Sequence, residues 1–209
     1  MTKLPEHRPE SPPSEPSEPS ELPETPRIAH HWPILAGIGA AALIGLDMSE
    51  GIDAAPALAA SALVYFGAAA LRKPSVVWPL FFGSVVVIFA TELLGGGDVD
   101  PTWVILALAV PFLAYGLLQG RRSPNAPPPY GGWPYHLITM AAFGAAAAIA
   151  LGVTETVGAY FVAGGLLAHA AWDAYHYRIN KVVTRSLAEF CLVLDTIVAA
   201  VIVIVTVTD

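Results

Sequence analysis

The stretch Ser186–Val207, SLAEFCLVLDTIVAAVIVIVTV, decides the fold class of this chain. It is about as long as the roughly 20 residues that an α-helix needs to cross the hydrocarbon core of a bilayer. Its apolar residues follow one another without alternating with polar ones, which disfavours the strands of a membrane β-barrel. The stretch therefore predicts a transmembrane helix.

Six more apolar runs of similar length precede this one, and the composition supports the same interpretation. Of the 209 residues, 55% are hydrophobic and only 13% are charged, and the mean hydropathy is +0.59. A soluble domain carries about 25% charged residues, so this chain has too few charges to cover a water-facing surface. We expect an all-α integral membrane protein, a bundle of seven transmembrane helices within residues 28–209. The first six spans are expected at Ile28–Leu46, Ala54–Leu71, Ser75–Leu94, Thr102–Gln119, Trp133–Val153 and Thr156–Tyr177.

The N-terminal segment, residues 1–27, differs from the rest of the chain. It is rich in Pro, Glu and Ser, with a loose Ser-Glu-Pro repeat at Ser14–Pro16 and Ser17–Pro19. Such a segment cannot bury enough apolar area to offset its chain entropy. We expect a disordered tail and no cleavable signal peptide, with the first span acting as a signal anchor.

Charges in the joints between the apolar runs predict the orientation. Cytoplasmic loops accumulate Lys and Arg. Seven spans place every basic residue on one side, whereas six spans break this alternation. The predicted N-terminus is therefore cytoplasmic and the C-terminus extracytoplasmic. The basic joints hold Arg27, then Arg72 and Lys73, then Arg121 and Arg122, then Arg178, Lys181 and Arg185, and the other joints hold Asp47, Glu50 and Asp53, then Asp98 and Asp100, then Glu155, with Asp209 at the end.

A weak internal repeat suggests how the spans are grouped. Trp32-Pro33 opens the first three spans and Trp133-Pro134 opens the last three. Both halves would start on the cytoplasmic side, as in transporters with parallel repeats. The pattern suggests a 3+1+3 arrangement.

Ionisable residues within the bilayer are candidates for function because they are unfavourable there. Apart from Glu92 in the third span, they fall in the last three spans. Offsets of four and seven put His169, Asp173 and His176 on one face of the sixth helix. This helix is expected to end at the cytoplasmic side, where the seventh helix begins. We therefore expect the six groups to converge near the cytoplasmic face. They are His136, His169, Asp173, His176, Glu189 and Asp195.

Imidazoles and carboxylates together suit a transition metal such as zinc or iron. A metal-bound water becomes a nucleophile near neutral pH, so an intramembrane hydrolase or oxidase for a lipid-like or small-molecule substrate is one hypothesis. The pattern assigns no catalytic residue. A purely structural cluster is the alternative, with Asp195 bonded to His169 and Asp173 paired with Lys181 or Arg185. Glu189 and Arg185 are also spaced for a helical ion pair.

Two further classes of function stay open. A transporter or channel for a cation or small solute would use an acidic outer mouth together with the inner cluster. The mouth would comprise Asp47, Glu50, Asp53, Glu92 and Glu155. Alternatively, the protein could have a structural role or help to assemble a complex, which would require neither metal binding nor transport. No basic patch suggests nucleic acid.

Usage rich in Ala, Gly and Val suggests a high-GC bacterium, and hence a multi-pass protein of the bacterial plasma membrane. The lipid bilayer is then the one partner that the sequence implies. Nothing in the sequence indicates the oligomeric state.

The stretch His169–Asp195 resembles a pattern in small bacterial membrane proteins, in which a His-x2-Trp-Asp-x2-His helix precedes a helix with Cys and Asp. This resemblance implies no activity. Seven spans with a cytoplasmic N-terminus are also similar to the metal-dependent hydrolases of the ceramidase and progestin/adipoQ receptor group. That likeness implies zinc bound by histidines of several helices, including a His-x3-His pair. The corresponding spacing here is His169-x3-Asp173 and no early span offers a matching histidine, so no site residue is carried over.

Overall fold

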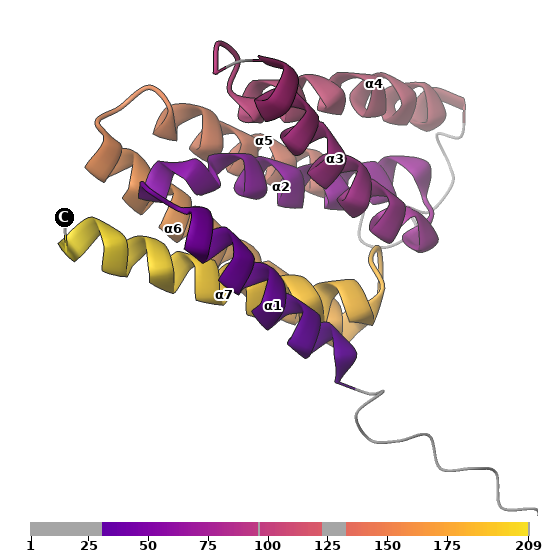
Figure 1. The fold of residues 1–209 in the computed structure, drawn as a ribbon. Coiled ribbons are helices and arrows are strands. Elements are labelled where there is room, and N and C mark those ends of the chain that lie inside the picture. The colour runs from indigo at the N-terminus through magenta and orange to yellow at the C-terminus, as the bar shows by residue number, and fades with distance from the viewer. Residues whose placement is uncertain (1–30, 96, 123–132, 209) are drawn as a thin grey trace, which may run out of the picture.

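The computed structural model describes residues 31–95, 97–122 and 133–208. Within these ranges the chain is helical and contains no strand (Figure 1), which confirms the all-α prediction. The predicted tail, residues 1–27, lies outside the described residues. The α-helices are α1 (Trp32–Asp47), α2 (Ala55–Leu71), α3 (Val77–Gly95), α4 (Pro101–Arg122), α5 (Trp133–Ala150), α6 (Glu155–Ile179) and α7 (Arg185–Thr208), with 3-10 turns η2 (Gly51–Ala54) and η3 (Pro74–Val76) before α2 and α3.

The joints after α2 and α6 are tight turns that stop each helix at a left-handed residue. Arg72 has a φ of 54°, and its N–H donates to the carbonyls of Ala68 and Ala69. Asn180 has a φ of 50°, and its N–H donates to the carbonyl of His176. A left-handed residue ends a helix by satisfying carbonyls of its last turn. These caps place the basic residues of both joints directly at the helix ends.

Helix α2 lies in the middle of the bundle, with α1 and α7 on one side and α3 and α4 on the other (Figure 1). In its most apolar stretch 78% of the residues are buried, against 11% in the stretch of η3 and α3. Small residues permit the close approach. A Cβ on Gly165 of α6 would lie 2.5 Å from the Leu58 side chain of α2, so glycine at this position lets α6 pack against α2.

The outer surface of α3 is strongly apolar. Phe89, Leu93 and Leu94 are 63%, 83% and 83% exposed. Soluble monomers rarely expose large continuous apolar patches, so this surface suits a lipid environment.

Four helical segments are long and apolar enough to cross a membrane, and they are compatible with a multi-pass membrane protein. They are Gly51–Leu71, Pro74–Gly95, Pro101–Gln119 and Arg185–Thr208.

The other three helices do not meet that criterion. Helices α1 and α5 contain shorter apolar segments, Trp32–Leu46 and Tyr135–Ala150. Helix α6 has 25 residues, and its polar residues include His169, Asp173 and His176. Three of the residues that lower the hydropathy of α6 are thus predicted site residues.

Candidate functional site

One face of α6 carries three buried polar side chains. His169, Asp173 and His176 are 1%, 0% and 2% exposed, as their offsets of four and seven predicted. Asp195 of α7, which packs beside α6, is 1% exposed. Four of the six predicted residues therefore lie together in the protein interior, and His136 of α5, which is 3% exposed, lies next to His176.

His169 joins the two carboxylates. Its Nδ1 lies 2.8 Å from Oδ2 of Asp195 and 3.1 Å from Oδ2 of Asp173. The hydrogen bond predicted between Asp195 and His169 is confirmed. We call His169, Asp173 and Asp195 the His–Asp cluster.

The His–Asp cluster has more acceptors than donors. Nδ1 of His169 carries at most one proton, and Asp195 is the nearer acceptor. Asp173 Oδ2 then keeps only an electrostatic contact and makes no hydrogen bond to the described residues. Burying carboxylates without compensating charge is strongly unfavourable. The cluster therefore needs either an additional proton or a bound cation.

Tyr65 of α2 completes the surroundings of Asp173. Its hydroxyl donates to Oδ1 of Asp173 at 2.5 Å, and its ring lies 5.3 Å from the His169 ring, centroid to centroid. Tyr65 is not among the predicted site residues, because it lies in the largely apolar predicted span Ala54–Leu71. The available signal was a single hydroxyl within an apolar run, since a buried Tyr usually finds a hydrogen-bond partner.

His176 and His136 lie beside the His–Asp cluster. The Nδ1 of His176 is 3.0 Å from the carbonyl of Trp172, and because a carbonyl only accepts, this nitrogen is the donor. The His176 ring centroid lies 4.9 Å from that of Tyr65 and 5.8 Å from that of His136 on α5. The His176 ring therefore packs against Tyr65, which is bonded to Asp173, and the His136 ring packs against His176.

Glu189 does not join this group. It is half-buried, and neither a hydrogen bond nor an ion pair links it to the part of the chain that the structure describes. The predicted pair with Arg185 is wrong, since the Arg185 guanidinium lies 5.9 Å from the Tyr177 ring centroid. Asp173 likewise pairs with His169 and not with Lys181, because its side chain points into the bundle, away from the exposed joint.

The cluster lies deep within the bundle. His169 is ten residues before the end of α6, and Asp195 is ten residues after the start of α7. At 1.5 Å per residue, each is about 15 Å from the basic joint that connects the two helices.

No protein-family model, no curated protein and no solved structure matches this chain. One ligand atom from each of His169, Asp173 and Asp195 lies within 4.8 Å of the others, so the cluster can hold a metal ion. The same atoms can also bind and release a proton.

Proposed function

We propose that this protein is a multi-pass membrane protein that binds a transition metal within the bilayer, with His169, Asp173 and Asp195 as ligands. The observation that carries the proposal is the approach of one imidazole nitrogen to two fully buried carboxylates from two helices. A divalent cation would compensate both negative charges and occupy the place of the shared proton. Imidazole and carboxylate together are a common donor set for such ions.

The donor set of one imidazole and two carboxylates suits iron(II) and zinc alike. The two Nδ1–Oδ2 distances, 2.8 Å and 3.1 Å, bring the three donors close enough to share one ion.

A bound ion would supply Lewis-acid chemistry and activate water in apolar surroundings. The residues of the chain would position it. Tyr65 would orient the Asp173 carboxylate through its hydrogen bond, as partners of metal ligands generally do. The substrate would be a small or lipid-like molecule that reaches the cluster.

Elemental analysis of protein purified without chelators tests this proposal. We expect about one zinc or iron ion per chain in the wild type and its loss in Asp195→Asn. Glu189→Gln is the matched control, because it removes a carboxylate from the same helix but from a side chain without polar contacts. Metal-free wild-type protein, or full occupancy in Asp195→Asn, would refute the assignment.

A second candidate function, proton or cation transport, is favoured by one specific observation. Polar rings continue from the His–Asp cluster through Tyr65 and His176 to His136. Such a chain of titratable groups is typical of a proton path. Ion-driven pH changes in proteoliposomes would support it, and undiminished flux in Asp195→Asn would exclude the cluster from the path. If the purified protein contains no metal and transports no ions, a role in assembling a complex is favoured.

We also propose seven spans in the bacterial plasma membrane, with the N-terminus in the cytoplasm. Support comes from the basic residues at or just after the C-terminal ends of α2, α4 and α6 and from the acidic residues in the intervening joints. In a Cys191→Ser background, Lys73→Cys should react with a membrane-impermeant maleimide only after the cells are opened. Asp98→Cys should react in intact cells. Labelling of both from the same side would contradict the topology.

A further inference from the structure

A cavity of about 700 Å³ lies between α1 and α3 and is also lined by residues of α2 and α7, but not by His169. Apolar side chains make most of its lining. Its walls and floor include Ala36, Ala40, Ser61, Phe89, Phe190 and Leu194. We call this cavity the α1–α3 groove.

Aromatic side chains close one end of the groove. The rings of Trp32 on α1 and Trp78 on α3 are 5.4 Å apart, centroid to centroid. The Trp78 ring also lies 5.8 Å from Phe81 and 5.5 Å from Phe190. This end is therefore lined by aromatic rings and is apolar, which suits the terminus of an alkyl chain.

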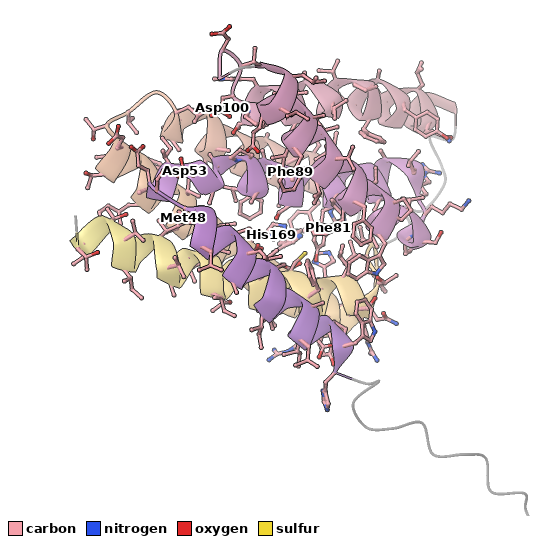
Figure 2. All side chains as sticks on the ribbon, in the orientation of Figure 1. Met48, Asp53, Phe81, Phe89, Asp100 and His169 are labelled. Carbon is pink, nitrogen blue, oxygen red and sulfur yellow. The ribbon has the colours of Figure 1, made fainter. Side chains whose placement is uncertain are left out.

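Carboxylates line the other end of the groove. Asp53 and Asp100 lie at the same end of the opening in Figure 2, and Glu92 lines the cavity near the end of α3. Asp53 accepts hydrogen bonds from the backbone of Ser49 and Glu50. Glu92 makes no hydrogen bond or ion pair within the described ranges. Lys and Arg are absent from the described lining, so this end carries only negative charge.

We propose that the α1–α3 groove binds a single-chain amphiphile with a cationic head, such as a long-chain primary amine. Its ammonium group would lie among Asp53, Glu92 and Asp100, and its alkyl chain would extend to the aromatic end. From Trp78 to Glu92 the groove follows α3 for about 21 Å, which suits a long alkyl chain. Phosphate head groups would be repelled by the three carboxylates. This proposal does not rest on metal binding.

Three photoactivatable probes with the same alkyl chain test the proposal. They are an octadecylamine, an octadecanoic acid and an octadecanol, each with a diazirine near the terminal methyl. Full-length protein in neutral phosphatidylcholine nanodiscs is irradiated with each probe, and labelled peptides are mapped by mass spectrometry. We expect the amine to label α1 and α3 residues of the groove, in competition with unlabelled octadecylamine. Labelling that does not saturate, or that falls only on outward faces, would overturn the proposal.

Selectivity for the cationic head is tested with paired variants. Glu92→Gln should weaken amine labelling about fivefold, as expected for a partly exposed ion pair, and leave the alcohol unchanged. Glu155→Gln removes the same charge from an exposed residue outside the groove and should have no effect. Equal labelling by amine and acid in the wild type would refute a cationic ligand.

Occupancy of the groove is tested by filling it. Ala40→Phe places a ring in the cavity and should abolish saturable labelling, whereas Ala42→Phe adds the same ring to an exposed position outside the lining. Saturable labelling that survives in folded Ala40→Phe would place the ligand elsewhere. If Ala40→Phe does not fold, the Glu92→Gln result alone decides.

Discussion

Replacing Tyr65 by Phe removes one hydroxyl from the interior and nothing else. The ring remains, and with it the edge contacts to His169 and His176 at 5.3 Å and 4.9 Å. What is lost is the hydrogen bond to Oδ1 of Asp173. Tyr65→Phe therefore isolates the contribution of α2 to the site.

The size of the effect follows from burial and charge. Tyr65 is 3% exposed and Asp173 is 0% exposed, so water cannot replace the missing donor. Hydrogen bonds to charged groups contribute about 1.5–3 kcal/mol in soluble proteins. Between membrane helices the average is only about 0.6 kcal/mol and the maximum about 1.7 kcal/mol. Because the acceptor is a fully buried carboxylate, we expect a loss near the upper membrane value, about 1.5 kcal/mol.

Two assays separate a structural role of Tyr65 from a metal-related one. Unfolding in mixed micelles, followed by circular dichroism during a dodecyl sulfate titration, gives the change in unfolding free energy. Competition with a chelator gives the metal affinity, which should fall about 10- to 100-fold when a partner of a ligand is lost. Tyr175→Phe, an exposed residue of α6 without a hydrogen bond to the described residues, is the control. A stability change under about 0.5 kcal/mol in Tyr65→Phe would refute the reasoning.

Three further predictions concern the cluster and the fold. Titrating metal-free protein with iron(II) should release protons, and the affinity should rise with pH, because the ion displaces the proton shared at His169; a pH-independent affinity would contradict this arrangement. Gly165→Ala should lower the unfolding free energy by about 2 kcal/mol, since its Cβ would lie 2.5 Å from Leu58, whereas Gly164→Ala meets no atom within 4 Å and should be neutral or stabilising by up to about 1 kcal/mol. Equal effects in the same titration would refute this account of the packing. Arg72→Gly should be about 1 kcal/mol more stable than Arg72→Ala in thermal unfolding, because both lose the charge but only glycine accepts a φ of 54° without strain; equal stability would argue against a left-handed cap.

Helix positions could be predicted from the sequence because apolar runs and charged joints are local features. The run Ser186–Val207 became α7, Arg185–Thr208, with a shift of one residue at each end. The central position of α2 could not be predicted in this way. Its hydropathy of 1.7 is close to the 2.0 of the η3–α3 segment, yet burial differs sevenfold between them. Side-chain size distinguishes them better, because the alanines of α2 permit close packing on several sides.

The site was predictable only where helix periodicity determines it. His169, Asp173 and His176 share a face of α6 because of their spacing, and depth alone suggested Asp195 as a partner. Depth was insufficient for Glu189. It lies six residues before Asp195, which rotates it by about 240° around α7, away from the interior. Tyr65 was missed for the related reason that an apolar run does not reveal which side of its helix faces the site.

The relation between the groove and the His–Asp cluster bears on the kind of chemistry the protein can perform. Leu194 lines the groove, and the next residue, Asp195, contacts His169, so one layer of side chains separates the two. Figure 2 shows His169 behind the opening, between Met48 and Phe81. A Cβ on Gly37 of α1 would lie 3.2 Å from Val193 of α7. Asp195, two residues farther along α7, is therefore about 10 Å from the level of Trp32, near the middle of the groove. A ligand with its head among the carboxylates would therefore present its alkyl chain, and not its head group, to a metal in the cluster. This geometry argues against hydrolysis of a bond at the head group of such a ligand by a metal held in the cluster.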